Sequence, residues 1–174
     1  MIKWGVIGTG HMANIFAESI QETDNAKLVA VSSRTKKSLE IFGDRFNIKE
    51  NLRFISNEEI CKSEDIDAIY SSTLNNTHFD LIKLCAINKK NILCEKPFCL
   101  NLNEAKELQK IIIINKVMFF EAIAYLSHPQ TSVIHDLSKL KVKLSQLNPH
   151  LVLRFEKSIL NLGYLIRNSV VVQF

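Results

Sequence analysis

The sequence predicts an α/β fold in which a mostly parallel sheet is covered by helices on both faces. Two observations predict it: strand-like and helix-like segments alternate over the first 120 residues, and a glycine turn follows the first strand. Strands that alternate with helices pair in parallel, because each crossover helix returns the chain to the same end of the sheet. A parallel sheet of this kind needs helices on both faces.

Six short runs rich in apolar and β-branched residues have the length of buried strands. They are 3–8, 27–33, 53–55, 68–73, 91–94 and 117–121. The stretches between them repeat apolar residues at helical spacing, as Leu81, Leu84 and Cys85 do. Helices are therefore expected at 12–21, 36–46, 57–63, 77–88 and 102–114. Asn101 and Asn103 are candidate N-caps of the fifth helix.

Composition excludes several classes of protein. The 174 residues, 47% hydrophobic and 23% charged, are typical of a globular protein with room for one domain and a fragment. The net charge of +4 comes without a concentrated basic run, so nucleic acid is not a favoured partner, and a patch for small anionic molecules would suit this charge equally well.

Targeting and redox signals favour a cytoplasmic protein. The start lacks the apolar segment of a signal peptide, and the apolar stretch 111–126 is too short and too polar to span a membrane. The four cysteines show no metal-ligand spacing, so no metal site is predicted and reduced, mostly buried thiols are expected. These cysteines are Cys61, Cys85, Cys94 and Cys99.

The turn after the first strand reads Gly-x-Gly-x-x-Ala, the fingerprint of dinucleotide binding. Gly8 allows a tight turn, Gly10 lets backbone N–H groups approach a pyrophosphate, and Ala13 keeps the next helix close to the sheet. The positive end of that helix then faces the phosphates. Glycine-rich turns are common, so the motif is evidence for dinucleotide binding only if the residues around it form a doubly wound sheet of the Rossmann type.

The end of the second strand indicates which dinucleotide fits. No acidic residue occurs between Leu28 and Lys37, where an NAD site usually has one to bind the ribose 2′-hydroxyl. Ser33 can donate to a 2′-phosphate, and Arg34 can offset its charge. The sequence therefore favours NADP over NAD, with a solvated loop arginine as the alternative for Arg34.

Polar residues also follow the fourth and fifth strands, at the edge where open α/β sheets bind ligands. Asn75 and Asn76 could instead cap the next helix, with His78 in its first turn, and by themselves they favour capping. Lys96 stands between Glu95 and Pro97. Its ammonium could bind the ribose or nicotinamide and stabilise a developing alkoxide, or it could be a surface lysine before a turn.

These motifs occur in order, together with the run Glu-Ala-x-x-Tyr-x-x-His-Pro-Gln that begins at Glu121. As an ordered set they closely resemble the glucose–fructose oxidoreductase/inositol dehydrogenase (Gfo/Idh/MocA) family. The resemblance covers about residues 1–137 and is nearest to the NADP-using branch of dihydrodiol and sugar dehydrogenases. Leu74 replaces a usual Pro and Leu126 a usual Arg, which should loosen one loop and remove a polar contact near the domain junction.

The resemblance implies a role for each motif. The pyrophosphate is expected to contact Gly8, Thr9, Gly10, His11 and Met12. The adenosine ribose should meet Ser33 and Arg34, and the nicotinamide side Thr73, Asn75 and His78. Glu95 and Lys96 should reach the nicotinamide ribose and the substrate, with Lys96 as the catalytic lysine. The implied reaction is hydride transfer between NAD(P) and a sugar-like or diol substrate.

The remaining expectations concern the end of the chain. Residues 1–120 form the expected cofactor domain, and 121–139 a junction with a short helix near 129–138. The tail 140–174 departs from the family, whose members continue into a second, α+β domain that binds substrate and builds the oligomer. Only the beginning of that domain is expected here.

Read one nucleotide out of frame, segments 144–152 and 168–174 permit sequences like that second domain, so a frameshift between 137 and 144 is our hypothesis. A divergent but genuine short C-terminus is the alternative. Weak cofactor binding and little or no turnover are then expected. The alternative functions are a non-catalytic NADP-binding regulatory module and a non-functional gene remnant.

Overall fold

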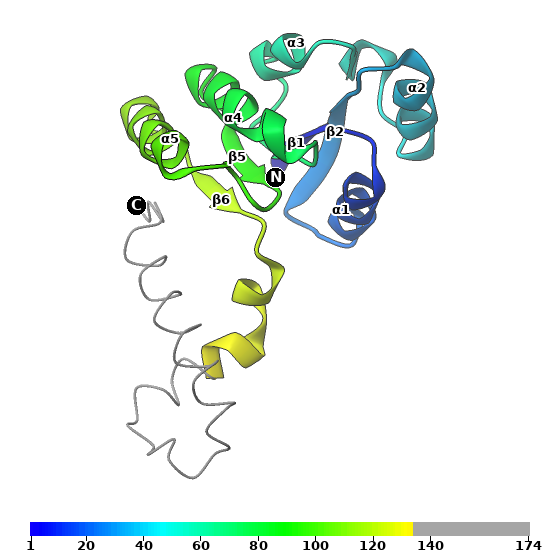
Figure 1. Ribbon diagram of the computed structural model, residues 1–174. Helices are drawn as coiled ribbons and strands as arrows, with labels where there is room; N and C mark the ends of the chain where they lie inside the picture. Colours follow the sequence, from blue (N-terminus) through cyan, green and yellow to red (C-terminus); the bar gives the residue numbers. More distant parts are fainter. Residues whose placement is uncertain (134–174) are drawn as a thin grey trace. The chain divides into compact units, whose positions relative to one another are not determined.

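A computed structural model describes residues 1–133, and its main compact unit is Met1–Ala122 (Figure 1). This unit is built on a six-stranded sheet of order β3-β2-β1-β4-β5-β6. Every neighbouring pair is parallel. The strands are β1 (Ile2–Ile7), β2 (Ala26–Ser32), β3 (Arg53–Phe54), β4 (Ala68–Ser71), β5 (Asn91–Cys94) and β6 (Phe119–Glu121).

Helices cover both faces of the sheet, with α1 and α2 on one and α3, α4 and α5 on the other (Figure 1). They are α1 (His11–Gln21), α2 (Lys36–Arg45), α3 (Asn57–Lys62), α4 (His78–Ile87) and α5 (Leu102–Asn115). Short 3₁₀ turns are η1 (Glu50–Leu52), η2 (Asn75–Thr77) and η3 (Ala124–Ser127). The predicted doubly wound fold is confirmed, and each expected element is present with ends within two residues of those predicted.

Side-chain caps explain where three of the helices begin. The side chains of Thr35, Ser56 and Asn101 accept hydrogen bonds from backbone N–H groups in the first turns of α2, α3 and α5. Of the two candidate caps for α5, Asn101 is therefore the one used, and Asn103 lies inside the helix. Each cap satisfies an N–H group that the helix itself leaves without a partner.

The core lies on both sides of β1. Ala13 and Ala17 of α1 are fully buried, so their small side chains bring the helix close to the sheet, as expected for Ala13. On the same face, Phe16 stacks on Tyr70 with ring centroids 4.3 Å apart and meets Trp4 edge-on at 5.3 Å. On the other face, a Cβ at Gly5 would lie 3.2 Å from Ile60, so glycine there allows close packing.

The cysteines behave as packing residues. Three of the four are buried, as predicted, and Cys99 is half-buried. The Cys61 and Cys85 sulfurs lie 3.5 Å apart between α3 and α4. Burial raises the pKa of the Cys94 thiol to about 12, so the reactive thiolate is not formed near neutral pH.

After Ala122 the structure describes only eleven more residues, 123–133. They contain η3, and residues 129–133 are helical where the junction helix was expected. The rest of that helix, the tail 140–174 and the proposed change of reading frame lie outside the described residues. Within residues 1–133, no helix has the length and apolar character needed to cross a membrane.

One largely buried arginine ties α2 to β3. Arg53 donates through Nε to the Ile48 carbonyl (2.9 Å), and through Nη1 to the carboxylates of Glu40 and Asp44 (2.7 Å each). Its side chain is 10% exposed. A Cβ at Gly43 would overlap its Nε and Cζ atoms, so α2 can approach Arg53 only because Gly43 has no side chain.

We therefore expect Gly43→Ala to destabilise the protein by about 1 to 3 kcal/mol, because Arg53 is held at three points and cannot move aside. Helix propensity by itself predicts the opposite, a gain of about 1 kcal/mol. Chemical denaturation measures the sign. In an Arg53→Ala background the same replacement should be neutral or stabilising. A stabilising Gly43→Ala in the otherwise unchanged chain would contradict this account.

Candidate functional site

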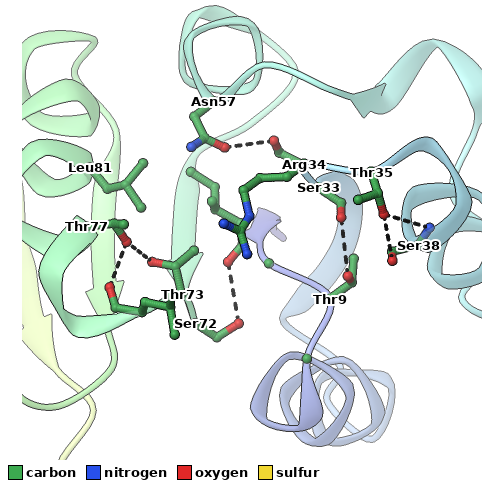
Figure 2. Close-up of a pocket in the computed structure, with 15 residues that line it drawn as sticks. Thr9, Ser33, Arg34, Thr35, Ser38, Asn57, Ser72, Thr73, Thr77 and Leu81 are labelled. Atoms are coloured by element: carbon green, nitrogen blue, oxygen red, sulfur yellow. Dashed lines mark hydrogen bonds between the residues drawn. The ribbon is translucent and has the colours of Figure 1, made fainter.

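A pocket of about 360 Å³ opens at the carboxyl ends of β1, β2 and β4 (Figure 2). On one side lie Thr9 of the β1 turn, Ser33 directly after β2, and Thr35 and Ser38 at the start of α2 (Figure 2). The other side is formed by the loop that follows β4 and by helix α4. The further lining residues are Ile7, Gly8, Gly10, Ser32, Arg34, Asn57, Ser72, Thr73, Leu74, Thr77 and Leu81.

The glycine turn at the pocket floor has two different requirements for glycine. Gly8 adopts φ +102°, and a Cβ there would lie 3.0 Å from the carbonyl oxygen of Ser72, the residue directly after β4. Gly10 is the N-cap of α1, and a Cβ there would meet no atom within 4 Å. Gly8 is thus needed for the fold, whereas Gly10 leaves open space at a helix N-terminus.

That open space suits a phosphate group. The first turn of α1 has no acidic residue, so its N–H groups and positive dipole end are available to an anion. His11 and Met12 are the exposed first residues of this helix and do not line the pocket. The predicted pyrophosphate contacts therefore divide into the lining residues Gly8, Thr9 and Gly10 and two residues beside them.

Two residues outside the motif hold this turn in place. Asn14 donates through Nδ2 to the carbonyls of Gly10 (2.8 Å) and Thr9 (3.3 Å). Arg45 of α2 donates in turn to the Asn14 side-chain oxygen (2.8 Å). Neither residue was predicted from the sequence, although Asn14 lies directly after the fingerprint and four residues beyond Gly10.

The β2 side of the pocket is polar, with one positive charge. The Ser33 and Thr9 hydroxyls lie 3.3 Å apart, and Arg34 is exposed at the rim. The Thr35 hydroxyl caps α2 and donates to Ser38 Oγ (2.8 Å). In the part of the chain that the structure describes, no acidic residue lines this pocket. This side of the pocket therefore has no carboxylate that would repel an anionic group.

Asn57 also lines the pocket, although it was not predicted from the sequence. Its side-chain oxygen accepts a hydrogen bond from the buried Ser32 hydroxyl (2.9 Å), so it is fixed to the end of β2 (Figure 2). Asn57 follows β3, whose carboxyl end lies at the same edge of the sheet. That position was the available signal, but β3 has only two residues and its loop carries no motif.

The loop after β4 gives its three predicted residues different places. Thr73 lines the pocket and its hydroxyl lies 2.7 Å from that of Thr77. Asn75 lies in η2, exposed and outside the lining. The alternative, that Asn75 and Asn76 cap α4, is not supported, because Thr77 is the N-cap and no side chain caps the helix.

His78, the third residue predicted for the nicotinamide side, is not among the residues that line the pocket. Its side chain is fully buried, with Nδ1 2.8 Å from the Pro97 carbonyl oxygen and Nε2 3.2 Å from the Thr73 carbonyl oxygen. We expected it to line the nicotinamide side, yet its ring lies between the backbone carbonyls of two loops, of which a neutral imidazole can donate to one. The structure therefore places His78 behind the pocket wall, as support for it.

Glu95 and Lys96 follow β5, outside the pocket lining but at the same edge of the sheet. The Tyr70 hydroxyl donates a hydrogen bond to Glu95 Oε1 (2.7 Å). Burial, together with this hydrogen bond, raises the pKa of Tyr70, so the hydroxyl stays protonated and remains a donor. Lys96 is exposed and its backbone N–H lies 3.4 Å from Glu95 Oε2. The peptide bond between Lys96 and Pro97 is cis.

Solved structures share this fold. One is scyllo-inositol dehydrogenase from Lactobacillus casei with bound NAD(H) and scyllo-inositol, which is 22% identical with a TM-score of 0.74 over 80% of this chain and 41% of that one. Another is KijD10, a 3-ketoreductase from Actinomadura kijaniata, in complex with TDP-benzene and NADP. It is 22% identical, with a TM-score of 0.72 over 79% of this chain and 43% of that one.

Curated relatives are more similar in sequence. The uncharacterized oxidoreductase YgjR of Escherichia coli is 37% identical over 70% of this chain and 37% of its own length. Trans-1,2-dihydrobenzene-1,2-diol dehydrogenase of Xenopus laevis is 34% identical over 61% and 32%. The NADP(+) scyllo-inositol 2-dehydrogenase IolU of Bacillus subtilis is 29% identical over 84% and 42%. The chain thus spans about a third to two fifths of the length of these relatives.

Residues 2–123 match the family described as "Oxidoreductase family, NAD-binding Rossmann fold", Gfo/Idh/MocA. The match covers nearly all of the compact unit and every lining residue of the pocket. The glycine turn, the open space at Gly10 and the acid-free β2 side fit a dinucleotide independently of that match. The chain belongs to the Gfo/Idh/MocA family of NAD(P)-dependent oxidoreductases.

Proposed function

We propose that the unit Met1–Ala122 binds NADP(H), in preference to NAD(H). The observation that supports this most strongly is the composition of the β2 side of the pocket. Ser33, Thr35 and Ser38 supply hydroxyls there, Arg34 supplies the one positive charge, and no acidic lining residue among those described competes with a phosphate. A 2′-phosphate needs donors and a cation, whereas a free 2′-hydroxyl is best met by a carboxylate.

The other parts of the cofactor would lie along the same carboxyl edge of the sheet. The pyrophosphate would lie at Gly8–Gly10 and the first turn of α1, with His11 and Met12 beside it. Thr73 and Asn75 would face the nicotinamide side, and Glu95 and Lys96 its ribose. When bound, the nicotinamide supplies the hydride acceptor or donor for the reaction.

We further propose that these residues serve hydride transfer at a hydroxyl-bearing carbon of a sugar-like or diol substrate. The names of IolU and of the dihydrodiol dehydrogenase, two relatives at 29% and 34% identity, support this class. Lys96 would donate a hydrogen bond to the substrate oxygen and stabilise the negative charge that develops on it. Lys96 is exposed, and the residue before it, Glu95, accepts a hydrogen bond from Tyr70. The backbone at Lys96 is therefore restrained, while its ammonium can still extend to the substrate.

The preference for NADP has a direct test in Arg34→Ala. We expect this change to weaken NADPH binding about tenfold or more, because a charged hydrogen bond is worth about 1.5 to 3 kcal/mol. NADH binding should stay within about twofold, since that cofactor has no 2′-phosphate to lose a partner. Fluorescence titration gives both dissociation constants. Lys110→Ala removes an exposed positive charge on α5 and is the matched control. Equal losses for NADPH and NADH would exclude the proposed role of Arg34.

The two glycines of the turn should separate stability from binding. Gly8→Ala should lower the stability by about 1 to 3 kcal/mol, because φ +102° is strained for alanine and its Cβ would meet Ser72. Gly10→Ala should cost less than about 1 kcal/mol, since its Cβ meets nothing, yet weaken NADPH binding about tenfold by occupying the phosphate space. Thermal unfolding and NADPH titration measure the two effects. Unchanged NADPH affinity in Gly10→Ala would place the pyrophosphate elsewhere.

A further inference from the structure

One peptide group beside Lys96 is hydrogen-bonded on both sides by side chains from distant parts of the chain. His78 Nδ1 lies 2.8 Å from the Pro97 carbonyl oxygen. The N–H of Phe98, which belongs to the same peptide group, donates to Glu121 Oε1 at 3.1 Å. The Pro97–Phe98 peptide is therefore held between α4 and the end of β6.

The histidine side of this arrangement is fully enclosed. His78 begins α4 and none of its surface is exposed, so its hydrogen bonds face no competition from water. A buried N–H without a partner would be costly, and the Pro97 carbonyl oxygen, the nearer of the two carbonyls beside the ring, can accept from it. The shorter contact is to Pro97, one residue after Lys96.

The glutamate side is half-buried. Burial raises the pKa of Glu121, while the hydrogen bond from Phe98 and the nearby His78 oppose that rise by favouring the charged form. Glu121 pairs with Cys94 in the sheet, so its backbone is fixed beside the end of β5. A carboxylate accepting from one end of a peptide and a ring donating to the other polarise that peptide in the same direction.

The residue before Lys96 is also held. Tyr70 donates to Glu95, and the Tyr70 ring is itself packed against Phe16. Lys96 is thus the exposed residue between two restrained neighbours. Its own side chain has four rotatable bonds, so a fixed backbone is what limits the region its ammonium can sample.

We propose that His78 and Glu121 are positioning residues for Lys96, which hold the Pro97–Phe98 peptide so that the lysine points from the sheet edge toward the bound dinucleotide. This inference rests on the proposed function, because it takes Lys96 as a contact of the cofactor. It assigns His78 a role through the β5 loop, although the same ring also contacts the β4 loop at Thr73.

Two pairs of variants separate positioning from simple packing. The amide nitrogen of an asparagine can take the place of Nδ1, so His78→Asn keeps a donor for Pro97. A glutamine amide reaches the place of Nε2, so His78→Gln keeps the contact with Thr73 and loses the one with Pro97. At the other end, Glu121→Gln keeps an acceptor for Phe98 and Glu121→Met removes it. The second pair tests the same peptide should a His78 variant fail to fold.

The decisive measurement is NADPH affinity with and without the lysine. We expect Lys96→Met to weaken binding about tenfold, and His78→Gln and Glu121→Met about fivefold each, as for the loss of one hydrogen bond. His78→Asn and Glu121→Gln should stay within about twofold of the unchanged chain. In the Lys96→Met background, His78→Gln and Glu121→Met should have almost no further effect, because what they position is gone.

A second measurement reads the peptide directly, without cofactor. The amide proton of Phe98 should titrate in NMR spectra with a midpoint above 4.5, the ordinary glutamate pKa, as Glu121 takes up a proton. The titratable groups near Glu121 are His78, Cys94 and Cys99. Glu121→Gln should therefore abolish this titration, and His78→Gln should shift the Phe98 signal more than His78→Asn does.

The outcomes distinguish the inference from the function on which it rests. An unchanged chain that binds no NADPH overturns the proposed function and the inference with it. If NADPH binds, but His78→Gln and Glu121→Met weaken binding equally with and without Lys96, the two residues act on the pocket by another route and the inference is wrong. A Phe98 signal that ignores Glu121 would overturn it as well.

Discussion

The register of the parallel sheet is the constraint on which the site depends. One residue from each of the six strands is paired with its neighbour in the next strand, and together they form one continuous row across the sheet. In strand order they are Phe54, Ser32, Ile7, Ser71, Cys94 and Glu121. The residues that come next, among them Gly8, Ser33 and Glu95, leave the sheet from a common line. A shift of one residue in any strand would turn its side chains to the other face and separate these loops.

This row also explains why the loops constrain one another. Gly8 passes so near to Ser72 that a side chain could not fit, since β1 and β4 are paired up to their last residues. The Ser33 and Thr9 hydroxyls meet for the same reason on the β2 side. Backbone groups that leave a sheet together must find partners, and here side chains such as Asn14 and His78 provide them.

Much of this could be predicted from sequence, because local signals decide it. The alternation of strand-like and helix-like periodicity predicted the order of strands and helices along the chain. Five residues predicted from motifs that follow the strands do line one pocket: Gly8, Gly10, Ser33, Arg34 and Thr73. Cofactor contacts of the individual residues stay predictions.

Other parts depend on contacts between distant segments, which one sequence does not reveal. A histidine in a first helical turn is ordinarily exposed, and His78 is buried only because two loops present carbonyls to it. Asn57 and Arg45 carry no motif, and they reach the site through a two-residue strand and a helix end.

The aromatic packing under Glu95 has a practical consequence. Trp4 is the only tryptophan among the 174 residues, and it contacts Phe16, which stacks on the tyrosine that holds Glu95. Indole emission from this chain therefore comes from a single place, where α1 meets the sheet. The protein carries an intrinsic optical reporter, two aromatic rings away from the carboxylate beside Lys96.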